Sequence, residues 1–205
     1  MMTAESFGKT DIFLWERATP QETINLLKDA YNFFTKNAVK ESFKVAALKI
    51  VAKYVAKAGF PKDQTAFNAA ALYVVYRMPI LYPNHRSKKE FADRLKITEA
   101  SLDWYVNSIV DTLQFFTLRD RKNFPYYIER DGITFSVISS VVKVLVEEAL
   151  VQGWTEIKRF DIKTVVDKIL DMLITTLRII PPVFRRDLGN KIEAYLQEEF
   201  SNTKL

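Results

Sequence analysis

The side chains in this sequence best suited to binding a partner are lysines and arginines at regular spacing. Lys49, Lys53 and Lys57 recur every four residues, so on a helix they would form one stripe. A second, denser group comprises Arg86, Lys88, Lys89, Arg94 and Lys96. Rows of such cations contact phosphate oxygens and hold a protein on nucleic acid without reading its base sequence. The alternative is that these residues only solvate exposed helix faces.

A third basic group lies among aromatic residues. Its cations are Arg119, Arg121, Lys122 and Arg130, and its aromatic members are Phe124, Tyr126 and Tyr127. Cations interleaved with rings suit single-stranded nucleic acid, whose bases stack on the aromatic faces. The alternative is a linker that is held in place by aromatic packing against the rest of the protein.

The sequence lacks the residues and motifs that most catalytic sites need. The chain has no cysteine, which excludes thiol catalysis, iron–sulfur clusters and cysteine-ligated zinc. His85 is the single histidine, so neither a histidine-based triad nor a multi-histidine metal site is expected. No glycine-rich phosphate loop is present, and no spacing marks a pair of carboxylates for acid–base work. We therefore expect no enzyme, no cofactor, no metal site and no small-molecule substrate.

The charge of the chain is mildly basic and unevenly distributed. The formal net charge is +5, from 30 Lys and Arg against 25 Asp and Glu. Residues 1–130 hold 20 basic and 14 acidic side chains, whereas residues 131–205 hold 10 and 11. If the protein binds a polyanion, the first two thirds of the chain is the part that we expect to do so.

The composition predicts an all-α fold. Only 5 glycines and 7 prolines are present, and these are the residues that form tight turns and bulges. Apolar spacing of the helical period predicts helices at 20–36, 41–58, 64–77, 87–95, 99–116, 134–152, 161–180 and 184–200. Gly59 and Gly153 are expected to end the second and sixth of these helices. Thr19 and Thr98 are expected to cap the first and fifth.

One predicted helix has no polar face. Residues 66–76 are apolar almost all round and contain three consecutive alanines. Such a helix must be enclosed by others, so we expect it at the centre of a ring of amphipathic helices. On the first helix, we expect Ile24, Leu27, Tyr31 and Phe34 to form the buried face.

We divide the chain into an N-terminal extension (1–19), a helical domain (20–118), an irregular linker (119–132) and a C-terminal helical half (133–205). The longest apolar stretch, residues 133–142, is about half of what spans a bilayer. The N-terminus lacks the layout of a signal peptide. We therefore expect a cytoplasmic protein that makes no membrane contact and is nucleoid-associated if it binds DNA.

Residues 42–116 resemble a cyclin box, specifically the core repeats of archaeal transcription factor B and eukaryotic transcription factor IIB. In the third helix the resemblance rests on Pro61 followed by the Ala69-Ala70-Ala71 core and a Tyr-Val-Val-Tyr-Arg ending. In the next two helices it rests on Lys89-Glu90-Phe91-Ala92 and on Thr98-Glu99-Ala100-Ser101-Leu102. It implies a five-helix repeat with a buried central helix. The smaller, three-helix second half is then a degenerate repeat or a different bundle.

The resemblance also implies partners. Members of the family contact promoter DNA and the TATA-binding protein. Their helix-turn-helix contacts the DNA through the start of its last helix, which corresponds here to Ser101. Glu99, Asp103 and Asp111 depart from the family by placing acidic groups on that helix, where phosphates would repel them.

Two functions follow from these observations. The first is a transcription-associated factor that contacts DNA non-specifically and binds the basal transcription machinery. The second is a protein–protein adaptor that uses the cyclin fold without nucleic acid, which the acidic residues near Asp103 favour. Spacing alone leaves open whether Trp15, Trp104 and Trp154 are exposed anchors or core residues.

Overall fold

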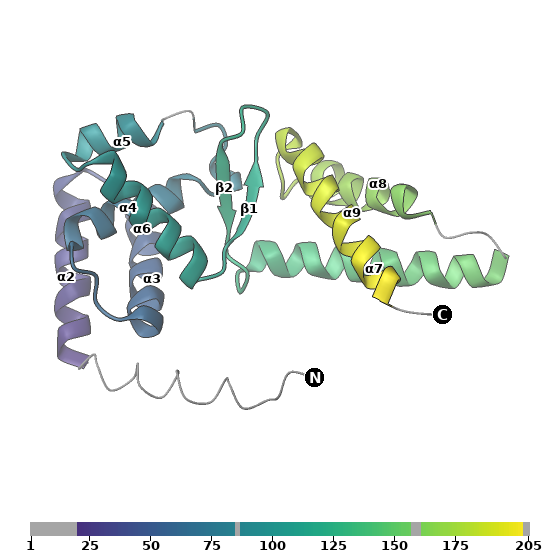
Figure 1. The fold of residues 1–205 in the computed structure, drawn as a ribbon, viewed down its shortest axis with the longest axis horizontal. Coiled ribbons are helices and arrows are strands. Elements are labelled where there is room, and N and C mark those ends of the chain that lie inside the picture. Colours follow the sequence, from purple (N-terminus) through teal and green to yellow (C-terminus); the bar gives the residue numbers. More distant parts are fainter. Residues whose placement is uncertain (1–19, 85–86, 157–160, 203–205) are drawn as a thin grey trace. The chain divides into compact units, whose positions relative to one another are not determined.

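The computed structural model describes residues 20–84, 87–156 and 161–202. The chain forms two compact units, which Figure 1 shows along the sequence. Unit 1 holds the residues up to Arg77 together with Pro83–Phe115. Unit 2 holds Met78–Tyr82 and the residues from Phe116 onward. This division differs from the predicted one, because the short segment Met78–Tyr82 leaves the first unit and joins the second.

The described part of unit 1 consists of helices in the predicted order. They are α2 (Pro20–Lys36), α3 (Glu41–Ala58), α4 (Gln64–Tyr76), α5 (Lys88–Leu95) and α6 (Glu99–Thr112). The first two have the predicted bounds, while α6 ends before the predicted residue 116. The prediction of a mainly helical fold is therefore confirmed at this coarse level.

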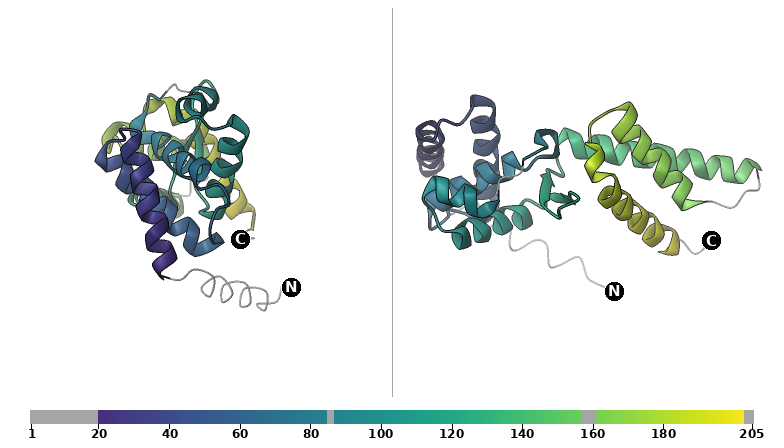
Figure 2. Two further views of the ribbon diagram at one scale, coloured as in Figure 1. Left: turned by 90° about the vertical axis from the view of Figure 1, so that its left-hand side faces the viewer. Right: turned by 90° about the horizontal axis from the view of Figure 1, so that it is seen from above.

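Helix α4 lies at the centre of unit 1, as its apolar sequence requires. Every residue from Ala66 to Val75 is buried. Helices α3 and α6 pack closely on α4, and α2 and α5 also contact it, which Figures 1 and 2 show from different sides. Its Phe67 ring meets Tyr54 of α3 at 4.8 Å and Tyr105 of α6 at 5.7 Å between centroids. The predicted burial of this helix is confirmed.

Local capping explains where the helices of unit 1 begin. The Asp63 carboxylate accepts the Ala66 N–H at 3.0 Å, and the Thr98 hydroxyl accepts the Ser101 N–H at 3.1 Å. Ser87 and Glu90 form a reciprocal capping box at the start of α5. Gly59 ends α3 with a φ of 79°, a conformation that suits glycine. The predicted cap Thr19 lies outside the described residues.

The predicted buried face of α2 is wrong in part. Leu26, Ala30 and Phe34 are buried, whereas Ile24 and Tyr31 are 45% and 41% exposed. Helix α2 carries two apolar stripes, and the stripe containing the small Ala30 lets the helix approach its neighbours closely. Tyr31 instead lies under the Lys44 ammonium, 4.9 Å from the ring centroid.

Unit 2 contains a β-hairpin, which the sequence did not predict. Strands β1 (Phe116–Arg119) and β2 (Pro125–Ile128) pair antiparallel, with Phe116 opposite Ile128 and Arg119 opposite Pro125. At the turn, the Asp120 carboxylate accepts the N–H groups of Lys122 and Phe124, both at 2.9 Å. The expected irregular linker at 119–132 is therefore an ordered part of unit 2.

Three α-helices follow the hairpin: α7 (Ile133–Glu156), α8 (Ile162–Asp171) and α9 (Arg185–Asn202). Helix α7 continues through Gly153, the residue expected to end it. Helix α8 passes into a π-helical turn at Met172–Thr176, and a 3₁₀ turn at Pro182–Phe184 leads directly into α9. Across the described residues, each helix is too short or too polar to cross a lipid bilayer.

The core of unit 2 joins the hairpin to these helices. The Tyr126 ring of β2 meets Phe184 at 4.9 Å and Tyr82 at 5.7 Å between centroids. Ile169 of α8 and Leu188 of α9 are fully buried in the same cluster. The aromatic residues of the hairpin thus fix it against α8 and α9.

Candidate nucleic-acid interface

Helix α5 and its C-cap carry four of the predicted phosphate-contact residues: Lys88, Lys89, Arg94 and Lys96. Its buried face consists of Phe91, Ala92 and Leu95. Because these residues fix the orientation of the helix, Lys89 and Arg94 project into solvent. Lys96 follows as the C-cap and is also exposed, with a φ of 55° that turns the chain toward α6.

Internal contacts engage one cation and one anion of this surface. The Lys88 ammonium forms an ion pair with Asp103 of α6, so it is already neutralised within the protein. The Glu90 carboxylate accepts the Ser87 N–H at 2.8 Å as part of the capping box. The exposed charge on α5 and its C-cap therefore comes from Lys89, Arg94 and Lys96 against Asp93 and the capping-box carboxylate of Glu90.

Arg94 is positioned by an aromatic ring. Its guanidinium lies 5.1 Å from the Phe91 ring centroid while the residue remains exposed. A guanidinium over a ring keeps its outward N–H groups available to an anion. This contact holds the arginine on the exposed side of α5.

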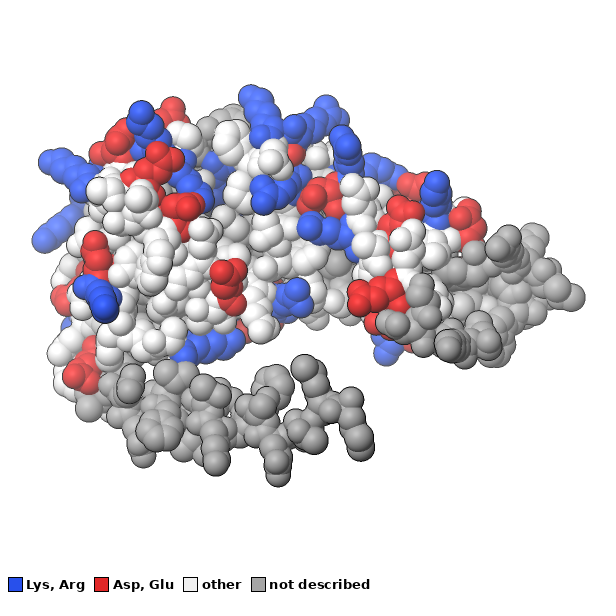
Figure 3. Space-filling view, viewed as in Figure 1, with Lys and Arg blue, Asp and Glu red and all other residues white. Residues whose placement is uncertain are grey.

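The lysine stripe on α3 is separate from α5. Lys49 and Lys57 are exposed and Lys53 is half-buried. Helix α3 packs on α2, α4 and α6, whereas α5 packs on α6 and α4. In Figure 1, α5 lies at the top of unit 1 and α3 toward the bottom. The two basic groups therefore form two patches rather than one continuous surface. Figure 3 shows acidic side chains interspersed among the basic ones in this unit.

Ser101, which the family motif places at the DNA, takes part in the cap of α6. Its hydroxyl oxygen accepts a hydrogen bond from the Thr98 hydroxyl at 2.8 Å, and the residue is half-buried. Nearby, Glu99 and Asp111 are exposed and Trp104 is 60% exposed. The outer face of α6 is thus acidic and aromatic. Arg86 and His85 lie outside the described residues.

The aromatic residues of the third basic group cannot stack on bases. Tyr126 and Tyr127 are buried and Phe124 is half-buried, because the hairpin packs on the core of unit 2. This contradicts the single-strand stacking interpretation and agrees with aromatic packing against protein. The cations of the group remain at the surface, where Arg119, Arg121, Lys122 and Arg130 are exposed.

We searched the described residues for a metal site and compared the chain with known proteins. Among residues 20–84, 87–156 and 161–202, no group of three or more His, Asp or Glu side chains is placed to hold a metal ion. Comparisons of the chain with models of protein families, with curated proteins and with solved structures find no match. The cyclin-box resemblance stays a prediction from the two motifs and the order of the helices.

Proposed function

We propose that the chain is a non-catalytic, cytoplasmic binding protein that holds DNA through its phosphates without reading base sequence. The observation that carries this proposal is the exposed surface of α5 and its C-cap, where Lys89, Arg94 and Lys96 project beside the exposed acids Glu90 and Asp93, and the Glu90 carboxylate is engaged in the capping box. Lys49 and Lys57 of α3 add a second, separate patch. Contacts of this kind supply affinity by releasing counterions.

A role in transcription, with the TATA-binding protein as partner, rests on the resemblance to the transcription factor B core. Two features of unit 1 support it. The enclosed helix α4 corresponds to the buried helix that the resemblance implies, and α5 and α6 are joined by the short turn at Lys96 and Ile97. With Ser101 engaged in the α6 cap, the proposed DNA contacts come from α5 rather than from the start of α6.

A fluorescence anisotropy titration with a short DNA duplex tests the proposal. The affinity is expected to fall by a factor of about 10³ between 50 and 200 mM salt if about six phosphates are contacted. Lys89→Glu with Lys96→Glu is expected to weaken binding to all sequences alike. Lys28→Glu is the matched control, because Lys28 is an exposed lysine on α2 and belongs to neither patch. Absence of binding at low salt would exclude this function.

A protein–protein adaptor is the second candidate, and Trp104 favours it. An exposed tryptophan beside acidic residues has the character of an interface anchor for a basic partner. The Trp104 ring meets Tyr105 edge to face at 4.7 Å, which limits its mobility. A stoichiometric protein partner that survives nuclease treatment and is lost in Trp104→Ala would select the adaptor over the DNA-binding protein.

A further inference from the structure

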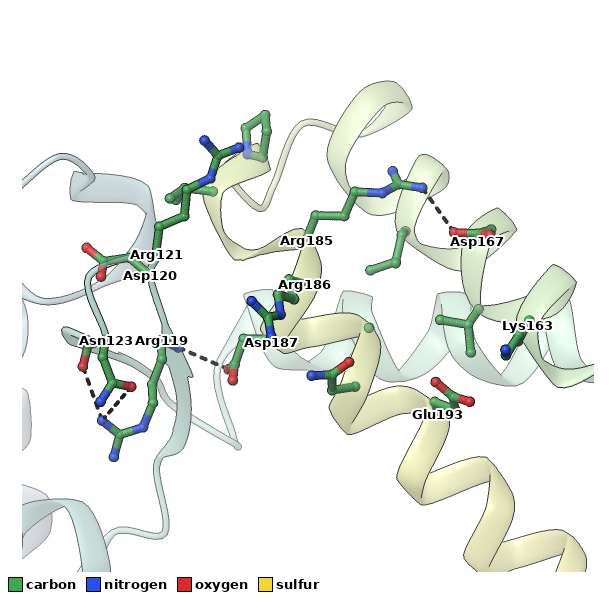
Figure 4. A pocket seen from close by; sticks show the side chains of 16 residues that line it. Arg119, Asp120, Arg121, Asn123, Lys163, Asp167, Arg185, Arg186, Asp187 and Glu193 are labelled. Carbon is green, nitrogen blue, oxygen red and sulfur yellow. Dashed lines mark hydrogen bonds and ion pairs between the residues drawn. The ribbon is translucent and has the colours of Figure 1, made fainter.

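Unit 2 contains an open groove of about 1130 Å³ between the tip of the hairpin, α8 and the start of α9. Figure 4 shows its polar lining from close by. Arg121 reaches it from the hairpin turn, Lys163 from α8 and Arg186 from α9. Three elements far apart in the sequence thus bring cations to one groove.

The acidic side chains of the groove are engaged with the protein itself. Asp120 accepts two backbone N–H groups at the hairpin turn. Asp187 accepts the Arg119 N–H at 3.0 Å, and Glu193 accepts from the Gln197 amide at 3.3 Å. Asp167 binds the Arg185 guanidinium at 3.2 Å, and that guanidinium also binds Asp171 at 2.7 Å. The carboxylates therefore have internal donors.

Two of the cations lack such internal partners. Within the part of the chain that the structure describes, the guanidinium groups of Arg121 and Arg186 make no hydrogen bond or ion pair, and both residues are exposed. Arg119 differs, because its guanidinium donates to the Asn123 carbonyl oxygen at 3.2 Å. The guanidinium groups of Arg121 and Arg186 are therefore available to bind an anion in the groove.

The position of Arg186 at the start of a helix is expected to lower the stability of the fold. Arg185 and Arg186 are the first two residues of α9, directly after the 3₁₀ turn. The N-terminal end of a helix carries partial positive charge, so cations there are disfavoured. Asp167 and Asp171 offset the charge of Arg185, and the hydrogen bond that its guanidinium donates to Asp171 is the main reason that the Arg185 pKa is raised. Arg186 has no comparable partner, and residues that break a local rule in this way often serve function.

We propose that this groove is a second phosphate-binding site, in which Arg121 and Arg186 clamp the phosphodiester backbone of a nucleic acid. Guanidinium groups bind phosphate oxygens in a bidentate geometry, and the helix N-terminus adds favourable potential for an anion. Tyr126 and Tyr127 are buried, so the site contacts the backbone and does not stack on bases. The identity of this ligand rests on the proposed function, whereas the site uses residues of unit 2 only.

The test measures DNA binding by the full chain across salt concentrations. Arg121→Glu with Arg186→Glu is expected to lower the affinity about tenfold or more and to reduce the salt slope by about 2, the value for two lost phosphate contacts. Lys168→Glu is the matched control, because Lys168 is exposed on α8 but does not line the groove. Arg121→Lys with Arg186→Lys is expected to keep the salt slope.

A stability measurement separates a binding role from a structural one. Arg186→Glu is expected to raise the melting temperature, because an anion replaces a cation at the start of α9, while DNA binding weakens. A variant that both melts earlier and binds less would assign Arg186 to structure and overturn the proposal.

The remaining outcomes separate this inference from the proposed function. If Lys89→Glu with Lys96→Glu abolishes DNA binding and the double arginine variant binds normally, the groove proposal fails and the function stands. If the wild-type chain binds no DNA but binds poly-glutamate through Arg121 and Arg186, the groove takes acidic peptides. That outcome overturns both the phosphodiester assignment and the proposed function.

Discussion

Lys88 of α5 forms an ion pair with Asp103 of α6, which joins the two helices on either side of the turn at Lys96 and Ile97. The Asn107 amide donates to the same carboxyl group at 3.3 Å, so Asp103 is held from both sides. The pair takes one cation out of the predicted phosphate surface and masks one of the acids that would repel DNA.

Asp103→Asn is expected to increase the affinity for DNA, because it removes a negative charge and releases Lys88. The cost in stability is expected to be under about 1 kcal/mol, since the Asp103 side chain is 46% exposed. DNA anisotropy and urea unfolding measure the two effects. Asp111→Asn is the control, because Asp111 is exposed on the same helix and forms no ion pair within the described residues. Equal gains in both variants would assign the effect to net charge alone.

Phe67→Ala is expected to destabilise unit 1 by about 3–5 kcal/mol, the usual cost of removing a buried aromatic ring. Phe67 is fully buried in α4 and its ring contacts Tyr54 and Tyr105. The midpoint of urea unfolding, monitored by circular dichroism, measures the change. Ile80→Ala is the comparison, because Ile80 is 80% exposed and its loss is expected to have little effect. A small effect of Phe67→Ala would mean that α4 is not enclosed in solution.

Acidification is expected to weaken the start of α8 through Asp161. A hydrogen bond from the Thr164 hydroxyl, at 2.6 Å, is the main cause that lowers the Asp161 pKa below its ordinary value. A lowered folded-state pKa gives stability that is present above the ordinary Asp pKa of about 3.9 and is lost as the pH falls through the folded-state pKa. Asp161→Asn is expected to flatten this part of the stability profile, measured by urea unfolding at a series of acidic pH values. An unchanged profile in the variant would place the acid sensitivity elsewhere.

Arg185→Ala is expected to have a small effect on stability and a larger one on DNA binding. The Arg185 side chain is 40% exposed, so its pairs with Asp167 and Asp171 together contribute under about 1 kcal/mol, and salt reduces that value. Its removal leaves both carboxylates without this cation, and Asp167, which lines the groove, then repels phosphate. Melting temperature and DNA affinity at two salt concentrations measure the outcome. A variant that keeps full affinity would show that these carboxylates lie outside the DNA path.

The sequence predicts the fold well where the information is local. The bounds of α2 and α3 follow from apolar periodicity, and Thr98, Gly59 and the enclosed α4 follow from capping and composition. The hairpin escapes prediction because its strands are four residues long and are stabilised by pairing and by packing on Phe184. A strand of that length carries too little periodicity to be distinguished from a loop.

The candidate sites are harder to predict because they depend on distant pairings. The partner of Lys88 lies 15 residues away on another helix, and nothing in the spacing of either residue indicates the pair. The unit 2 groove combines the turn around Arg121 with Lys163 and Arg186. Sequence alone shows that each is a surface cation, but not that the three face one space.

Because Met78–Tyr82 belongs to unit 2, the two units cannot be produced as separate continuous fragments without loss. Tyr82 belongs to unit 2 and its ring meets both Tyr126 and Phe184, although the residues on either side of the excursion belong to unit 1. No single cut of the polypeptide separates the two units intact. A fragment that starts at Phe116 lacks Tyr82, an aromatic residue of the unit 2 core. Such a fragment, whether made by limited proteolysis or expressed separately, is therefore an incomplete unit 2.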